Sequence, residues 1–280
     1  MQQSLPAILS THRSAQPFLK WAGGKRKLVG DILRAAPPRF ERYLEPFLGG
    51  GAVALSVDCP KLLLNDGNAE LINTYIVVRD QLPALQTALD EHRRAHSEQH
   101  FYAVRARNPD EMHEIDRAAR FIYLNKACFN GLYRVNREGK FNVPYGHAKK
   151  LTIYDRENLR AVSEILQHSE LSALDYKEFL EQARAGDFVY LDPPYAPVSK
   201  FSDFKRYTKE QFRESDQYDL ATVFQQLIDV GAYPILSNSH TELTLEMYSR
   251  YNIQVVHMTR NINADSKGRA PIREILVTPK

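Results

Sequence analysis

Short apolar runs alternate with amphipathic segments through most of this sequence. The run Phe-Val-Tyr-Leu at 188–191 is short, continuous and rich in strand-favouring residues, which is the pattern of a buried strand. Similar runs predict strands over 42–44, 61–64, 171–174, 188–191 and 233–237. The segments between them predict helices over 27–33, from residue 52 onward, and over 156–167, 177–185 and 209–230. This alternation indicates an α/β fold with a largely parallel sheet and helices on both faces.

Two regions depart from this alternation. Residues 69–129 form a long helical pattern with charged faces, and the next twenty or so residues, to 150, are loop-like, aromatic and basic. Near the end of the chain, 253–259 and 272–277 have the pattern of a β-hairpin. We therefore expect a main domain built from 17–68 and 151–280, an inserted domain over 69–150, and a flexible tail over 1–16.

Composition narrows the class of protein only slightly. A chain of 280 residues fits one large α/β domain with an insertion, and 43% hydrophobic with 25% charged residues is typical of a soluble globular protein. The net charge of +3 permits an anionic partner without requiring one. Apolar runs stay well short of the roughly 18 residues that a membrane span needs. Cys59 and Cys128 lack metal-site spacing, so we expect a cytoplasmic protein without a metal.

The four residues Asp192-Pro193-Pro194-Tyr195 directly follow the predicted strand at 188–191. The two prolines fix the backbone and remove two donors, which leaves carbonyl oxygens as acceptors. A carboxylate, carbonyl acceptors and an aromatic face together suit a planar ring that carries an amino group. The alternative is an ordinary stiff turn after a strand, and these four residues alone do not decide between the two.

A glycine-rich turn, Glu45-Pro46-Phe47-Leu48-Gly49-Gly50-Gly51, follows another predicted strand. Such a turn lets a ligand approach the backbone closely and uses the N-terminus of the following helix. Asp66 ends the next strand, where an acidic residue accepts from ribose hydroxyls in nucleotide-binding α/β folds. The glycine pattern differs from that of dinucleotide sites, and a purely structural tight turn remains the alternative.

Two further segments carry candidate chemistry. The sequence FLKWAGGK at 18–25 holds the single tryptophan, Trp21, and this segment taken alone favours a core tryptophan at the entry to a helix. A strong turn signal, Asn130-Gly131, lies among aromatic and basic residues. Such residues suit phosphate contact, base stacking and guanine recognition, and a polar surface hairpin is the alternative. The basic residues of this loop are Arg134, Arg137, Lys140, Lys149 and Lys150.

Together these motifs resemble a known family. FLKWAGGK, EPFLGGG, a basic loop centred on Asn130-Gly131 and ending in FNVPYG, and DPPY occur in this order in the Dam-type, alpha-class DNA adenine-N6 methyltransferases. The resemblance spans residues 17 to about 278. It implies a Rossmann-like sheet that binds S-adenosylmethionine, an inserted, mainly helical target-recognition region, and a C-terminal β-hairpin. It also implies methylation of adenine N6 in double-stranded DNA by base flipping, by an enzyme that is a monomer in solution.

The resemblance also assigns site residues. The catalytic motif would be Asp192, Pro193, Pro194 and Tyr195. The cofactor would contact Trp21, Lys25, Glu45, Phe47, Gly49, Gly51, Asp66, Asp175 and Asp192. DNA would contact Lys20, Phe129, Asn130, Leu132, Arg134, Asn136 and Pro144.

Members with this type of loop usually methylate GATC, where Arg134 matches the position that reads a guanine. Phe129 stands where many relatives have an intercalating tyrosine. The competing interpretations are a methyltransferase acting on RNA or on a protein amide, and a DNA-binding homologue that has lost catalysis. The basic loop argues against the first, and the complete set of cofactor-contacting matches argues against the second. A generic nucleotide-binding domain is the remaining possibility.

Overall fold

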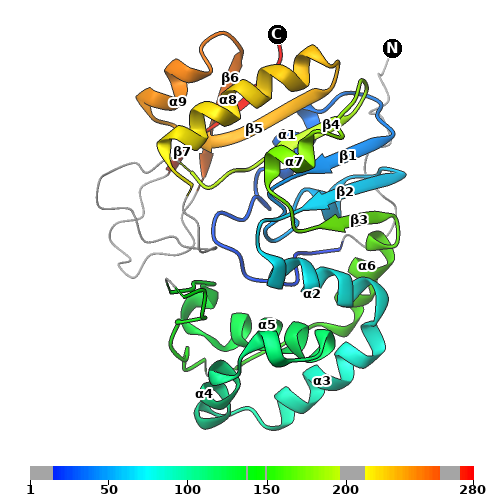
Figure 1. Ribbon diagram of the computed structural model, residues 1–280, viewed down its shortest axis with the longest axis vertical. Coiled ribbons are helices and arrows are strands. Elements are labelled where there is room, and N and C mark those ends of the chain that lie inside the picture. Colours follow the sequence, from blue (N-terminus) through cyan, green and yellow to red (C-terminus); the bar gives the residue numbers. More distant parts are fainter. Residues whose placement is uncertain (1–14, 137, 149, 196–211, 259–271) are drawn as a thin grey trace.

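The computed structural model of the chain describes residues 15–136, 138–148, 150–195, 212–258 and 272–280. At its centre is a seven-stranded sheet with the strand order β3-β2-β1-β4-β5-β7-β6 (Figure 1). The strands are β1 (Arg42–Glu45), β2 (Lys61–Asn65), β3 (Ser169–Ser172), β4 (Phe188–Leu191), β5 (Tyr233–Ser239), β6 (Asn252–Met258) and β7 (Ile272–Thr278). Strands β1 to β5 pair in parallel, and β7 runs antiparallel between β5 and β6. The predicted parallel sheet and C-terminal hairpin are both confirmed.

Helices cover both faces of this sheet, as the sequence predicts. The α-helices are α1 (Val29–Ala35), α2 (Ala69–Asp80), α3 (Leu82–Arg94), α4 (Glu98–Ala106), α5 (Glu114–Ala127), α6 (Arg156–Leu166), α7 (Tyr176–Leu180), α8 (Glu214–Asp229) and α9 (Glu242–Met247). Successive residues of β4 point to opposite faces, so Tyr190 packs with the core under α1, α2 and α6 while Leu191 packs with α7 and α8. All four residues of β4 are buried, which explains its uninterrupted apolar sequence.

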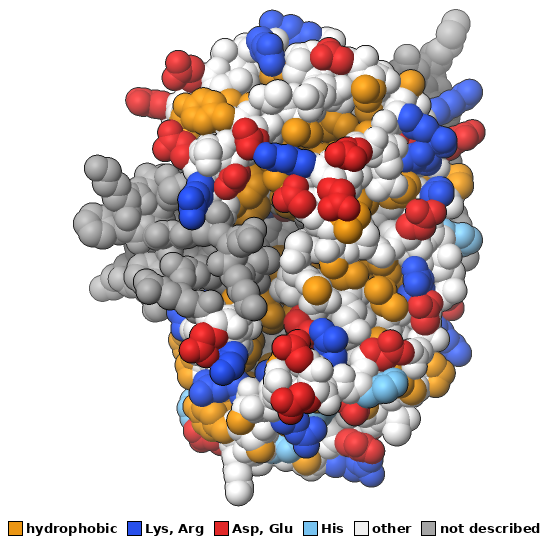
Figure 2. Space-filling model, in the orientation of Figure 1, with side chains coloured by type: hydrophobic (Ala, Val, Ile, Leu, Met, Phe, Trp, Pro, Cys, Tyr) orange, Lys and Arg blue, Asp and Glu red, His pale blue; other side chains and the backbone are white. Residues whose placement is uncertain are grey.

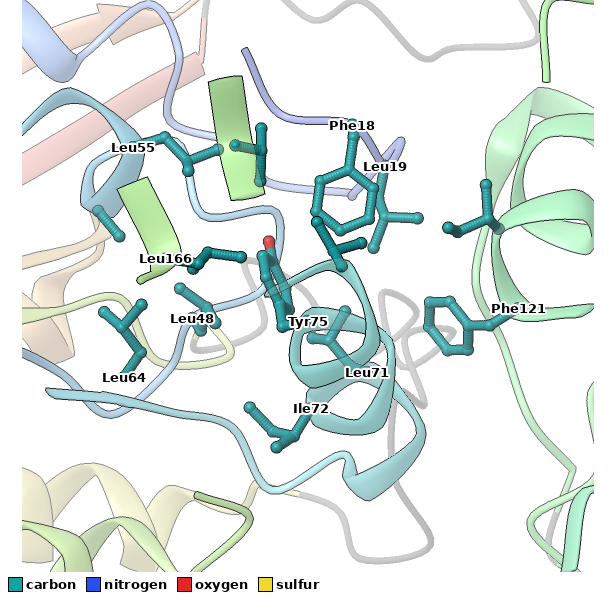
Figure 3. Packing of buried hydrophobic residues seen from close by; sticks show 14 of the residues in the cluster. Phe18, Leu19, Leu48, Leu55, Leu64, Leu71, Ile72, Tyr75, Phe121 and Leu166 are labelled. Atoms are coloured by element: carbon teal, nitrogen blue, oxygen red, sulfur yellow. The ribbon is translucent and has the colours of Figure 1, made fainter. Parts of the chain in front are cut away.

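The inserted region groups α3, α4 and α5 on one side of the sheet domain, with α2 between them and the sheet (Figure 1). Figure 3 shows the packing around α2, where Leu71 and Tyr75 meet Phe18 from the N-terminal segment, while Phe121 approaches from α5. The Phe18 and Tyr75 rings lie edge to face, with centroids 5.1 Å apart. One continuous apolar core therefore joins the sheet, α2 and the inserted helices.

The helix predicted over 27–33 forms as α1 two residues later, and three further predicted elements differ from the structure. A helix from residue 52 is wrong, because only the 3-10 turn Ala54–Ser56 forms before the chain must enter β2, and Pro60 directly precedes that strand. The strand predicted over 171–174 lies two residues earlier, because pairing of Leu62 with Ser169 sets its register against β2. The helix predicted over 177–185 is only the short α7, which ends five residues earlier.

Some predictions fall outside the described residues. These are most of the tail (1–14), the basic residues Arg137 and Lys149, the first residues of the helix predicted over 209–230, and residue 259 at the end of a predicted hairpin strand. The end of the predicted tail is anchored, since Asn158 exchanges two hydrogen bonds with the backbone of Gln16, at 2.8 and 2.9 Å.

The described surface is mixed in charge. On the face in Figure 2, Lys and Arg side chains are interspersed with Asp and Glu. Within the described ranges, we find no helix that is both long and apolar enough to cross a membrane.

Candidate active site

The loops that carry the predicted motifs meet at one edge of the sheet. Strand β1 pairs with β2 on one side and β4 on the other, and the chain order reverses between β1 and β4. In an open α/β sheet, the crevice outside the carboxyl ends of the strands at such a reversal binds ligands. The glycine turn follows β1, Asp66 follows β2, and Asp192 follows β4. The structure therefore brings these three motifs to a common edge.

The Asp192 carboxylate is held by two donors on the same oxygen. The Lys25 Nζ lies 2.9 Å from Asp192 Oδ1, and the Ser237 hydroxyl donates to the same atom over 2.9 Å. Because the Ser237 hydrogen is used there, the Tyr190 hydroxyl at 2.8 Å donates to Ser237. Burial raises the pKa of Asp192 above its ordinary value, and the Lys25 charge opposes that shift. The carboxylate is thus fixed in position before any ligand arrives.

Among the described residues, Lys25 is the only buried lysine, with 3% of its surface exposed. Besides Asp192, its ammonium donates to the Gly23 carbonyl over 2.6 Å and lies 4.6 Å from the centroid of the Tyr195 ring. An ammonium over an aromatic face is attracted by the ring quadrupole. Lys25 therefore points into the protein, whereas the next residue, Arg26, is exposed.

The glycine turn is shaped by two aromatic side chains. Gly49 has φ +49°, and a Cβ there would lie 2.8 Å from Trp21 Cδ1. Gly51 has φ +68°, and a Cβ there would lie 2.8 Å from the Tyr75 hydroxyl. That hydroxyl also donates to the Gly49 carbonyl over 3.1 Å. Both positions require glycine for backbone conformation and for space.

Asp66 sits between the glycine turn and the start of α2. One carboxylate oxygen accepts from the Gly49 N–H and the other from the Asn68 N–H, each at 2.9 Å. Burial raises the pKa of Asp66 to about 6, and the two backbone hydrogen bonds limit the rise. The Asn68 side chain caps α2 by accepting from the N–H groups of Glu70 and Leu71. The Asp66 carboxylate is therefore fixed against the turn.

Three other predicted cofactor residues have different surroundings. Glu45 is buried and accepts from the Tyr43 hydroxyl at 2.8 Å and the Ala54 N–H at 3.1 Å. These hydrogen bonds connect the start of the glycine turn to the residues that follow it. Burial raises the pKa of Glu45 well above its ordinary value. Phe47 packs on Tyr176, with ring centroids 5.2 Å apart. Asp175 is exposed and caps α7 by accepting from a backbone N–H at 2.8 Å.

The sequence interpretation missed Asn65, which ties the loops after three strands together. Its Nδ2 donates to the carbonyls of Pro46 and Leu174, both at 3.1 Å. Its Oδ1 accepts from the Ser172 hydroxyl at 2.8 Å and from the Leu174 N–H at 2.9 Å. A polar residue directly before Asp66 at the end of an apolar strand was the available signal.

The N-terminal segment joins this site to the inserted region. Asn125 of α5 accepts from the Lys20 N–H and donates to the Lys20 carbonyl, both at 2.8 Å. The Trp21 ring stacks on Tyr133, with centroids 5.5 Å apart, while its edge meets Gly49. Trp21 thus lies between the glycine turn and the basic loop, and not in the centre of a core.

Apart from Lys20, which is exposed on the N-terminal segment, the predicted DNA-contacting residues lie on a hairpin-like segment, 128–146, which we call the hairpin segment. Asn130 and Gly131 have φ +55° and +64°, which confirms the turn signal. Phe129 is 47% exposed beside that turn, and its N–H donates to the Pro144 carbonyl over 2.9 Å. Arg134 is exposed, and its Nε donates to Asn142 Oδ1 over 2.8 Å.

Two predicted DNA contacts on the hairpin segment are less accessible. Leu132 is half-buried, and Asn136 uses its amide oxygen to accept from the N–H groups of Glu138 and Lys140, at 3.0 and 2.9 Å. The amide oxygen of Asn136 therefore helps to close the tight turn within the segment.

Comparison with known proteins decides the family. The family described as D12 class N6 adenine-specific DNA methyltransferase matches residues 21–262. The chain belongs to this family. It is therefore a DNA adenine-N6 methyltransferase. The predicted resemblance to Dam-type enzymes and the predicted Rossmann-like sheet are both confirmed.

Three relatives show how far the similarity extends. The methyltransferase is 40% identical to the Type II methyltransferase M1.LlaDCHI of Lactococcus lactis subsp. cremoris, over 94% of this chain and 95% of the relative. It is 38% identical to the Type II methyltransferase M.MjaIII of Methanocaldococcus jannaschii, over 94% and 98%. It is 34% identical to the DNA adenine methylase of Escherichia coli strain K12, over 94% and 95%. Relatives therefore include both Type II methyltransferases and DNA adenine methylases.

Proposed function

We propose that this methyltransferase transfers a methyl group from S-adenosylmethionine to N6 of an adenine flipped out of duplex DNA, at the sequence GATC. The observation that carries the proposal is the state of Asp192, a carboxylate at the ligand-binding edge of the sheet with Lys25 and Ser237 both donating to Oδ1. Neither donor uses Oδ2. That oxygen is the acceptor we assign to the target amino group.

The chemistry requires acceptors for N6. The adenine N6 lone pair is delocalised into the ring, so N6 is a weak nucleophile. Hydrogen bonds from N6 to Asp192 and to the Pro193 carbonyl would localise that pair, and positive charge develops on N6 during transfer. Acceptors fixed in advance stabilise this charge more than they stabilise the ground state. The Pro194 carbonyl already accepts from Gln217 Nε2 at 2.9 Å, which favours Pro193 for this role.

The residues at the glycine turn fit the cofactor. Gly49 and Gly51 give the turn its left-handed backbone, and the partly buried Asp66 carboxylate beside it suits ribose hydroxyls. Trp21 and Phe47 supply apolar walls. Asp175, which is exposed at the start of α7, is the residue that we assign to the adenine ring of the cofactor. When bound, S-adenosylmethionine supplies the methyl group as a sulfonium. Lys25 and Glu45 act in this scheme by positioning Asp192 and the turn.

The hairpin segment fits duplex DNA and base flipping. The exposed Phe129 would insert where the adenine leaves, and Asn130 at the left-handed turn would occupy the same gap. Arg134 keeps its terminal guanidinium nitrogens for a guanine edge. Lys20, Leu132, Asn136 and Pro144 complete the proposed contact surface. In this scheme residues 69–150 are the recognition domain, and the protein acts as a monomer in the cytoplasm.

Single-molecule sequencing of DNA from a methylation-deficient bacterial host that expresses this chain tests the proposal. The expected result is N6-methyladenine at GATC on both strands, and its loss when the host expresses Asp192→Ala instead. Modification of another motif would refute the GATC assignment. Methylation that persists with Asp192→Ala would refute the role of Asp192.

A further inference from the structure

The aromatic residue of the DPPY motif is fixed at its far end by a strand that the motif does not include. The Tyr195 hydroxyl donates to Glu274 Oε2 over 2.7 Å. Glu274 lies on β7, 79 residues away, and is only 6% exposed. A hydrogen bond to a buried carboxylate is among the stronger ones in a protein. It restrains the plane of the ring as well as its position.

The sheet topology explains how Glu274 reaches the site. Strand β7 runs antiparallel to β5, with Ser239 opposite Glu274. The first residues of β7 therefore lie at the edge where the parallel strands end, which is the edge that carries Asp192 and Tyr195. A parallel seventh strand would place its first residues at the opposite edge. The reversed strand thus brings a carboxylate from the end of the chain into the ligand-binding edge.

The backbone of the same turn is anchored to β5. The Gln217 side chain of α8 donates to the Pro194 carbonyl over 2.9 Å, and Asn238 of β5 donates to Gln217 Oε1 over 2.9 Å. Asn238 and Gln217 are both buried. Tyr195 is therefore held at two points, its backbone through β5 and its hydroxyl through β7, and its ring has a defined orientation without DNA.

We infer that Glu274 is a positioning residue for methyl transfer, which presets the Tyr195 ring as the stacking surface for the flipped adenine. This inference rests on the proposed stacking role of Tyr195. A ring fixed in advance does not have to be ordered when the base arrives, so more of the stacking energy remains to offset the cost of flipping. Burial and the nearby carboxylates hold the Tyr195 pKa well above its ordinary value, so the hydroxyl remains a donor.

A double-mutant cycle with duplex DNA containing 2-aminopurine at the target position tests the inference. Tyr195→Phe and Glu274→Ala should each lower kcat/KM for DNA about tenfold and raise the fluorescence of the flipped 2-aminopurine, because the probe stacks on a looser ring. The double variant should lose less than the product of the two single losses, since both changes remove the hydrogen bond between Tyr195 and Glu274. Glu274→Gln keeps an oxygen acceptor and should restore most of the activity.

The control is Tyr251→Phe, which removes another hydroxyl hydrogen bond, to Gln225 Oε1 at 2.8 Å, away from the motif. It should leave kcat/KM and fluorescence unchanged. Multiplicative losses in the double variant, or wild-type values in Glu274→Ala, would overturn the positioning role. Should Glu274→Ala fail to fold, wild-type values in Tyr195→Phe would overturn it equally. Wild-type activity in Tyr195→Ala would instead refute the stacking role within the proposed function.

Discussion

The buried Lys25 ammonium lies 2.9 Å from Asp192 Oδ1, although the two residues are 167 positions apart in the sequence. It also lies 4.6 Å from the centre of the Tyr195 ring. The Lys25 ammonium is therefore close both to the carboxylate that we assign to the target amino group and to the aromatic ring that we assign to stacking on the base. The pair links the first motif of the chain to the last.

Lys25→Met should change the pH dependence of methyl transfer. The Lys25 charge lowers the pKa of Asp192 against the opposing effect of burial. Its removal should raise that pKa and move the acidic limb of kcat/KM to higher pH. A pH–rate profile at saturating cofactor measures the change. The exposed neighbour Lys27→Met is the control, and an acidic limb that is identical in all three proteins would contradict the assignment.

Cofactor affinity should fall in acid because of Asp66. Its pKa of about 6 means that the carboxyl takes up a proton as the pH falls through 6, and the protonated group accepts less well from ribose hydroxyls. Titration calorimetry should show the Kd for S-adenosylmethionine rising about tenfold per pH unit below pH 6. Asp66→Ser should bind more weakly and lack this dependence. An unchanged acid dependence in that variant would exclude Asp66 as its source.

The raised pKa of Asp66 has the opposite effect on folding. The carboxyl of the unfolded chain ionises at lower pH, so the ionised, partly buried group lowers the stability of the folded protein above pH 6. This cost is relieved as the pH falls from about 6 toward the ordinary range of an aspartate. Asp66→Ser should therefore flatten that part of the curve of unfolding free energy against pH.

Gly49→Ala should destabilise the protein, because the left-handed backbone alone costs roughly 1–2 kcal/mol for alanine and the new Cβ would meet the Trp21 ring. Gly67→Ala is a matched control in the neighbouring turn, since a Cβ there meets nothing within 4 Å. Denaturant titration should give a lower free energy of unfolding for Gly49→Ala and an unchanged one for Gly67→Ala. Equal stability of the two would show that the turn does not require glycine at residue 49.

Arg134→Ala should relax sequence specificity. Losing a bidentate contact to guanine costs about 1–3 kcal/mol of discrimination at one base pair. Methylation rates on GATC and on single-base variants measure this directly. Lys140→Ala, an exposed residue paired with Glu138 at 3.1 Å, should weaken all sites alike. A similar loss of discrimination in both variants would contradict the assignment of Arg134.

The sequence predicts the parallel sheet well because buried strands have a local signature. The predicted strand over 188–191 is confirmed without a shift, since four apolar residues stand between Asp187 and the DPPY motif. The start of β3 has no such local signature, because Ser169 belongs to the strand only through its pairing with Leu62 of β2. The helix expected after the glycine turn fails because the chain returns to the sheet within a few residues.

The motifs of the site were visible in the sequence, but their supporting contacts were not. Asp192 and Tyr195 stand in a recognisable motif, whereas Ser237 and Glu274 support them from strands far along the chain. Neither supporting residue belongs to a local pattern, and only the strand order brings it to the site. Asn65 is similar, because its four hydrogen bonds join the end of β2 to the loop after β1 and to the end of β3 with its following loop.

Single-turnover methyl transfer by Asp192→Ala is the most direct test of the central role of Asp192. The reaction is followed with labelled S-adenosylmethionine and a GATC duplex, after thermal unfolding and cofactor titration have shown that the variant is folded and loaded. Loss of the fixed N6 acceptor should lower the rate constant by at least about 100-fold. A rate constant close to that of the unmodified enzyme would contradict the account.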